Sequence, residues 1–211
     1  MAYIDKYGVE YTDDKETLVR CPIDYEGEYI IPDNVREIKD RAFESCRGLT
    51  FIHLPANLNS IEIAVFIGCS NLRKVEIPNT VCYINTDAFR ECYSLEEVSF
   101  YESNKEYGIP LYDIGKCAFS GCESLKRFDV PQGVTTIGVC AFARCDSLSY
   151  LSLPSSIEEI GAGAIECGEL CANPRIVANL KEIVVPIGEK ERFIKMFGEY
   201  GNELSSIIME C

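Results

Sequence analysis

Apolar residues recur along most of the chain with a period of 23 residues. The stretch from Ile31 to Pro55 reads IPDNVREIKDRAFESCRGLTFIHLP, and the next copy reads LPANLNSIEIAVFIGCSNLRKVEIP. Further copies follow as far as Pro154, and a broken copy ends at Pro186. A fixed period of this length is the sequence signature of a solenoid, in which each repeat stacks on the next.

Each repeat predicts two short strands and one turn. The first strand alternates: Val75 and Ile77 should point inward, and Lys74 and Glu76 outward. The second strand is a Val-x-x-Ile segment such as 35–38, followed by a helical or 3-10 turn through an Ala-Phe pair. Because the Phe recurs in every full copy, we expect these rings to stack inside the solenoid as an aromatic column.

The residue after the Ile of the second strand is Asn85, Gly115, Gly138 or Gly161 in successive copies. Asn and Gly are the residues that adopt a positive φ most readily. We therefore expect a turn with positive φ at this position.

Two insertions break the period. The first holds seven extra residues around Glu102 to Gly108, and Tyr101 there replaces the expected Pro. The second adds nine residues between Ile165 and Leu180. Insertions in a solenoid are edge loops, and these two follow different parts of the repeat, so we expect them on opposite edges. Two alternatives account for these insertions: a simple drift in the length of the repeat, or a contact with a partner.

The shared pattern is (I/L/V)-P-x-x-V-x-x-I-x-x-x-A-F-x-x-C-x-x-L-x-x-V-x-(I/L). The matching positions are the pairs Ala42-Phe43, Val65-Phe66, Ala88-Phe89, Ala118-Phe119 and Ala141-Phe142, the cysteines Cys46, Cys69, Cys92, Cys122 and Cys145, and the leucines Leu49, Leu72, Leu95, Leu125 and Leu148. This pattern resembles the BspA-like, or Treponema-type, leucine-rich repeats, which occur in gut and oral bacteria and in some protists. The resemblance implies a right-handed, β-rich solenoid of about six repeats over residues 31–187. The family includes adhesins and surface proteins, and it offers no catalytic motif to carry over.

The remaining segments predict two caps, which a solenoid needs to cover the ends of its core. Residues 1–30 should form a β-hairpin cap, with a polar turn at Thr12–Lys15 between two strands. Residues 188–211 should form a helical cap, since Phe193, Met196 and Phe197 share one helix face and a last strand can follow. Attachment to a membrane is the alternative for this helix. Together with the repeats, the caps make one domain, 1–211.

The composition excludes some partners. The net charge is −14, which disfavours nucleic acid and anionic membranes, since both require a basic surface. The chain contains no run of 18 apolar residues, so its sequence predicts no insertion into a membrane. The N-terminus lacks the basic and apolar regions of a signal peptide, so the sequence as it stands predicts a cytoplasmic protein. The family resemblance makes the cell surface or secretion the alternative.

Twelve cysteines raise the question of disulfides. Five of them occupy one column of the repeat, which indicates a buried ladder of thiols that pack as small apolar side chains. Cys117 and Cys140 form a second stacked pair. Disulfides between rungs stay open, because neighbouring strands lie roughly 4.8 Å apart and bridged cysteines about 4.4–6.8 Å apart.

The sequence predicts no enzyme, no cofactor and no metal site. The one histidine, His53, points outward from its strand, which indicates a surface residue rather than a catalytic base. Cys167 and Cys171 in the second insertion supply two thiols, too few for a tetrahedral zinc site. An enzyme that uses this insertion is a minor alternative.

The outward positions of the first strand vary from copy to copy while the inward ones repeat. In leucine-rich repeats this face lines the inner side of the arc, the usual binding surface. We therefore predict a protein-binding or peptide-binding face made by Phe51, His53, Lys74, Glu76, Glu97, Arg127, Asp129 and Tyr150. Aromatic residues and Arg dominate binding energy, which favours Phe51, Arg127 and Tyr150 among them. A merely solvated face is the alternative, and adhesion to a host protein or glycan is the second candidate function.

Overall fold

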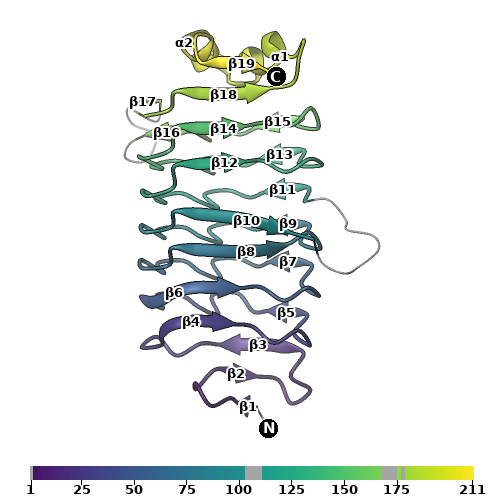
Figure 1. The fold of residues 1–211 in the computed structure, drawn as a ribbon, viewed down its shortest axis with the longest axis vertical. Coiled ribbons are helices and arrows are strands. Elements are labelled where there is room, and N and C mark those ends of the chain that lie inside the picture. Colours follow the sequence, from purple (N-terminus) through teal and green to yellow (C-terminus); the bar gives the residue numbers. More distant parts are fainter. Residues whose placement is uncertain (1, 103–110, 168–174, 177–178) are drawn as a thin grey trace.

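The structure of the protein is a computed structural model that describes residues 2–102, 111–167, 175–176 and 179–211. The chain winds around one long axis as a stack of rungs, with the two termini at opposite ends (Figure 1). The predicted solenoid is confirmed. Each rung has three sides, which carry a longer strand, a two-residue strand and an Ala-Phe turn.

The longer strands form the first side of the solenoid. They pair in parallel in two sheets, in the orders β10-β8-β6-β4 and β12-β14-β18-β19. Val75 and Ile77 are fully buried, as the alternation predicts. We call the outward side of these strands the long-strand face. The strands are β4 (Glu26–Ile30), β6 (Gly48–His53), β8 (Lys74–Pro78), β10 (Glu97–Tyr101), β12 (Arg127–Asp129), β14 (Tyr150–Ser152), β18 (Glu182–Val185) and β19 (Ile208–Glu210).

The second side carries the two-residue strands that the Val-x-x-Ile segments predict. β7 to β15 pair in parallel in one sheet, and β5 pairs with the N-terminal cap. The isoleucine of each strand points toward the core, and most of these side chains have almost no exposed surface. The strands are β5 (Glu37–Ile38), β7 (Ser60–Ile61), β9 (Tyr83–Ile84), β11 (Asp113–Ile114), β13 (Thr136–Ile137) and β15 (Glu159–Ile160).

The third side is built from the Ala-Phe turns, which stack through their backbones. The N–H of each column Phe donates to a carbonyl of the next rung, as from Phe43 to Val65 at 2.9 Å and from Phe142 to Ala164 at 2.7 Å. The residues two before and two after the Phe have left-handed φ, and as far as Cys140 and Gly121 they donate in the same direction. The first of these positions, with φ of 54° to 66°, holds Arg41, Ala64, Asp87, Cys117, Cys140 and Gly163; the second, with φ of 58° to 80°, holds Ser45, Gly68, Glu91, Gly121 and Arg144.

The expectation of positive φ at Asn85, Gly115, Gly138 and Gly161 is wrong. The glycines serve close packing instead. A Cβ added to Gly138 would lie 2.6 Å from the carbonyl carbon of Gly115 and from the amide nitrogen of Lys116. The left-handed residue comes two positions later, where Cys117, Cys140 and Gly163 stand.

The predicted aromatic column is confirmed in the centre of the solenoid. Phe43, Phe66, Phe89, Phe119 and Phe142 are all fully buried. Successive rings are stacked, with centroids 5.1–5.4 Å apart and interplanar angles of 27° or less.

The cysteine column beside it consists of buried free thiols, as predicted. From the second rung of the column on, each thiol donates to the carbonyl of the column Phe one rung earlier, at 3.0 Å from Cys69 to Phe43 and at 3.2 Å from Cys92 to Phe66, whereas the first thiol, Cys46, donates to the carbonyl of Pro22. Burial raises the pKa of Cys92 and Cys122 well above the usual value, so both stay protonated donors. The ten cysteines whose side chains the structure describes are all free.

The N-terminal cap is larger than the predicted hairpin. β2 (Glu10–Tyr11) and β3 (Thr17–Arg20) form the antiparallel hairpin, and β1 (Tyr3–Ile4) adds a third strand to it. β3 then pairs in parallel with β5, so the cap continues the second side of the solenoid. Inside the cap, the hydroxyl of Tyr29 donates to Asp5 at 2.7 Å.

The C-terminal cap follows the prediction closely. It comprises α1 (Lys190–Met196), the 3-10 helix η1 (Gly198–Tyr200), α2 (Gly201–Leu204) and β19, which extends the sheet beside β18. Phe193 and Phe197 are buried against the last rungs. Between the last repeats, β16 (Glu166–Cys167) pairs with β17 (Arg175–Ile176). The predicted edge positions of the two insertions, and the role of Cys171, fall outside the described residues.

The buried column makes a direct prediction about stability. Phe89→Ala removes a fully buried ring from between two stacked neighbours, so it should lower the free energy of unfolding by about 3–5 kcal/mol. Urea denaturation measures this loss. The matched control Glu97→Ala, on an exposed side chain of β10, should lose only a small fraction of it. Equal losses in the two variants would contradict the inside and outside assignment.

The glycine column makes a second prediction. Gly138→Ala places a methyl group against the backbone of the previous rung, and the rungs must move apart to accept it. We expect a loss of about 1–3 kcal/mol in urea denaturation, the usual cost of overpacking. Asn85→Ala is the matched control, because the same column already carries a Cβ there. A neutral Gly138→Ala would show that the approach of the rungs is not tight.

Candidate functional site

The predicted binding residues lie on the long-strand face, where parallel pairing sets them side by side. Phe51 is opposite Lys74, and His53 is opposite Glu76. On the next strand Glu97 follows Lys74 in register. The structure therefore gathers five of the eight predicted residues into one cluster on β6, β8 and β10.

The other three residues form a second cluster on β12 and β14. Arg127 is opposite Tyr150, and Asp129 follows Arg127 on the same strand. In the described sheets β12 does not pair with β10, so the two clusters belong to separate sheets of the same face.

Lys74 is the charged centre of the first cluster. Its ammonium group lies 3.1 Å from a carboxylate oxygen of Glu76 and 3.2 Å from one of Glu97. The other oxygen of Glu76 is 2.9 Å from Nδ1 of His53. The hydrogen bond from His53, and then that from Lys74, lower the pKa of Glu76 below its ordinary value. Four of the five side chains are thus held by one another.

Tyr101 belongs to this cluster, although the prediction left it out. Its ring stacks on the ring of His53, with centroids 5.0 Å apart and planes inclined by 21°. Its hydroxyl donates to the carbonyl of Leu54, which lies two rungs away, over a distance of 2.6 Å. Burial, with a smaller effect from Asp33 and Glu76, raises the pKa of Tyr101 to about 12. The signal in the sequence was the loss of the column Pro at this position.

The second cluster centres on the guanidinium group of Arg127. Two of its nitrogens donate to the two oxygens of Asp129, at 2.7 and 3.0 Å. The same group lies over the ring of Tyr150, 3.9 Å from the centroid. A guanidinium group prefers this combination of a bidentate carboxylate and an aromatic face. Arg127 is therefore fixed in place although it is exposed.

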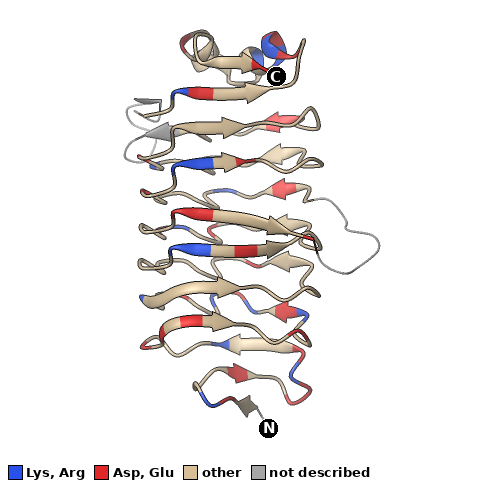
Figure 2. Cartoon of the chain, viewed as in Figure 1, with Lys and Arg blue, Asp and Glu red and all other residues tan. Residues whose placement is uncertain are grey.

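Both cations of these clusters are balanced by carboxylates, and the other charged residues of the face are acidic. Glu26, Glu28 and Glu182, on β4 and β18, have no ion pair with any described residue. Figure 2 shows basic and acidic segments side by side on β8 and β12. The face therefore has a negative balance, in agreement with the net charge of the chain.

The described residues offer little for catalysis. Within them, no three His, Cys, Asp or Glu side chains come together as a metal site. His53 is occupied by a carboxylate and a phenol ring, as described above. We also find no helix in the described part of the chain that is long and apolar enough to cross a membrane.

The family is established by comparison with known proteins. A family profile for the BspA type Leucine rich repeat region matches in six copies over residues 26–111 and 106–186. Because these ranges cover most of the chain, the protein belongs to this family, and its fold is a leucine-rich-repeat solenoid. Solenoids of this family are typically binding scaffolds without catalysis. None of the curated proteins matches the chain.

Three solved structures are similar to this chain. A leucine-rich repeat protein from Bacteroides ovatus is 28% identical with a TM-score of 0.62, and the match covers 88% of this chain and 47% of that one. A leucine rich cell surface protein from Faecalibacterium prausnitzii is 22% identical with a TM-score of 0.57, covering 80% and 50%. The Leucine Rich Repeat protein of T. pallidum is 23% identical with a TM-score of 0.60, covering 91% and 93%. This chain thus spans about half the length of the first two.

The pKa of Glu76 predicts how acid affects stability. Because the pKa of Glu76 is lower in the folded state, its pairing stabilises the fold fully at pH values above its unfolded pKa of about 4.3. This stabilisation is lost as the pH falls through the folded pKa. Glu76→Gln should therefore cost up to about 1 kcal/mol at pH 7 and progressively less between pH 5 and pH 3. Urea denaturation across this range measures the difference. Glu182→Gln is the control, and a cost for Glu76→Gln that does not vary with pH would contradict the assignment.

Proposed function

We propose that this chain is a non-catalytic protein-binding module that uses its long-strand face. The observation that carries the proposal is the fixed geometry of the two clusters. Arg127 and Tyr150, and His53 and Tyr101, are held in position by their neighbours in the unbound protein. A side chain that is already ordered loses less conformational entropy on binding, which favours affinity.

The chemistry of the face supports the choice of a protein or peptide partner. Aromatic rings and Arg are the residues that most often dominate binding energy, and Phe51, Tyr150 and Arg127 supply them. Phe51 lies between Glu28 and Lys74 in register, so an apolar anchor stands among charges. This mixture is typical of a binding patch with a polar rim.

The excess of carboxylates favours a partner with a basic or mixed-charge surface. Glu26, Glu28 and Glu182 leave negative charge for the partner to balance. Association should therefore weaken as the salt concentration rises, since ions screen exposed charges within about 8–10 Å.

Adhesion to a host protein or glycan at the cell surface is the second candidate. Its support is the structural likeness to the leucine rich cell surface protein from Faecalibacterium prausnitzii. The two sequences are 22% identical, and the likeness concerns the fold. It therefore supports a shared scaffold, and it supports adhesion only through that scaffold. A glycan would stack on Tyr150 or Phe51, and its binding should depend little on salt.

The test uses three baits against proteins of the source organism and its surroundings. They are the unchanged chain, a triple variant with Phe51→Ser, Arg127→Ser and Tyr150→Ser, and the control Tyr83→Ser on the exposed side of β9. A captured partner is purified and titrated by calorimetry at low and high salt. We expect the triple variant to lose at least tenfold in affinity, and the control to keep it.

The folded state of each bait is checked by circular dichroism before the titration. Equal affinity of the triple variant and the control would move the binding site away from the long-strand face. A partner that binds the unchanged chain equally at low and high salt would contradict the electrostatic part of the proposal.

A further inference from the structure

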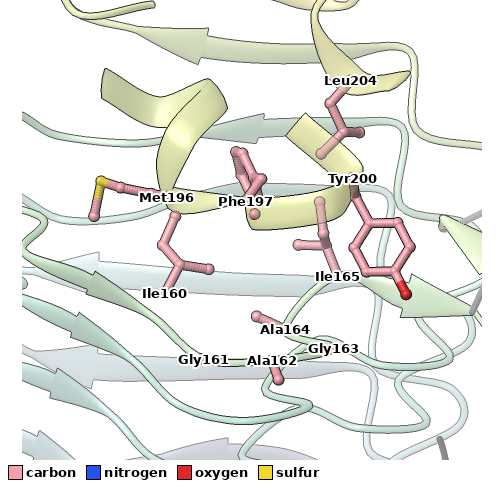
Figure 3. Close-up of a pocket in the computed structure, with 11 residues that line it drawn as sticks. Ile160, Gly161, Ala162, Gly163, Ala164, Ile165, Met196, Phe197, Tyr200 and Leu204 are labelled. Carbon is pink, nitrogen blue, oxygen red and sulfur yellow. The ribbon is translucent and has the colours of Figure 1, made fainter. Parts of the chain in front are cut away.

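A cavity of about 300 Å³ lies between the last turn of the third side, which holds Ala164 and Ile165, and the C-terminal cap. Its floor comes from the turn, which includes Gly163 and Ile165, and its roof comes from Met196, Phe197 and Leu204 of the cap (Figure 3). This size is at the lower end of the range of ligand pockets, about 300–1,000 Å³.

The place of the cavity in the repeat explains its origin. Each Ala-Phe turn is covered by the turn of the next rung, and this stacking continues as far as the turn that holds Ile165. After that rung the chain enters the helices of the cap rather than another Ala-Phe turn. The cap fills the position of the missing turn incompletely, and the cavity is the space that is left.

The floor of the cavity carries the next hydrogen-bond donor of the ladder. Residues at the first left-handed position donate their N–H groups to the next rung at 2.9–3.1 Å, ending with the bond from Cys140 to Ala162. Gly163 is the following residue in this column and has the same left-handed φ, 66°. Within the described part of the chain, no carbonyl accepts its N–H. A ligand with an acceptor oxygen would complete the ladder.

The aromatic column ends at the same place. Ile165 replaces the Phe of the earlier rungs, above the stacked ring of Phe142, and it is almost fully buried. Figure 3 shows its side chain between those of Phe197 and Tyr200 of the cap. The next ring of the column would occupy the cavity, so the site is shaped for an aromatic group.

We propose that this cavity binds a neutral one-ring aromatic group joined to a carbonyl, the chemistry of a phenylalanine amide. The ring packs between Ile165 and Phe197, and the carbonyl oxygen accepts the N–H of Gly163. A neutral carbonyl fits better than a carboxylate, because the chain has a net charge of −14 and the residues that line the cavity include no cation. The ligand is either a free small molecule or a Phe residue in an extended peptide.

The test compares four probes by NMR with the complete chain. N-acetyl-L-phenylalaninamide represents the free ligand, and acetyl-Ala-Phe-Ala-amide represents the peptide. N-acetylglycinamide lacks the ring, and toluene lacks the acceptor. We expect at least tenfold tighter binding of one of the first two probes than of either control. The amide proton of Gly163 and the methyl groups of Ile165 and Leu204 should show the largest shifts.

A variant tests the place of binding. Ile165→Phe restores the column residue, so its ring should enter the cavity, raise the melting temperature and weaken binding of the aromatic probe at least tenfold. Leu204→Phe fills the cavity from the roof and serves if the first variant does not fold. Tyr83→Ser, on β9 and remote from the cap, should bind as the unchanged chain does.

Three results would overturn the proposal. They are equal binding of N-acetylglycinamide and the phenylalanine probe, the largest shifts on the long-strand face, and unchanged binding by both folded cavity variants. The first and third results do not involve the residues of the proposed protein-binding face, so the two proposals can fail independently. Tighter binding of the amide or of the peptide decides between a small molecule and a peptide segment as the natural occupant.

Discussion

The structure depends on backbone hydrogen bonds that run from one rung to the next on all three sides. On the third side there is no strand to provide them. Alternating left-handed residues turn the N–H groups of Arg41, Phe43 and Ser45 toward the following rung, and the turns as far as that of Phe119 repeat the full arrangement. A left-handed φ in a non-glycine residue costs of order 1 kcal/mol, and the interlocking of the rungs offsets this cost. The stack of Phe rings inside each turn keeps successive turns at the same spacing.

The cysteine column follows from the same constraint. The carbonyl of each column Phe accepts the N–H of the Cys three residues later in its own rung, and as far as Phe119 it also accepts the thiol of the next rung, as Phe66 does from Cys69 and Cys92. A thiol suits this position because it is small and mostly apolar but still a weak donor. Five of the twelve cysteines therefore follow from the number of rungs. Among the ten cysteines whose side chains are described, none forms a disulfide.

Much of the fold could be predicted because it repeats. The period identifies the Phe column, the thiol column, and the inward and outward sides of the longer strands. Features that occur once escaped prediction: β1 in the N-terminal cap, the reach of Tyr101 across two rungs to Leu54, and the cavity under the C-terminal cap. The glycines were misjudged for another reason. Gly138 fits both a left-handed turn and a close approach of two backbones, and only the packing of the rungs distinguishes them. The sequence placed all eight candidate binding residues on one face, but their mutual contacts depend on side-chain conformations that have no signature in the repeat.

The stacking of rungs also has a mechanical consequence. The termini lie at opposite ends of the stack (Figure 1), so a pull on them acts along the direction of the hydrogen bonds between rungs. Under such a load the bonds of one terminal rung carry the force first, and rungs open one after another from a cap. Each opened rung lengthens the chain by roughly 70–80 Å in place of about 4.8 Å of folded stack. A protein of this construction behaves as an extensible tether, whose resistance to stretching is set by its two caps.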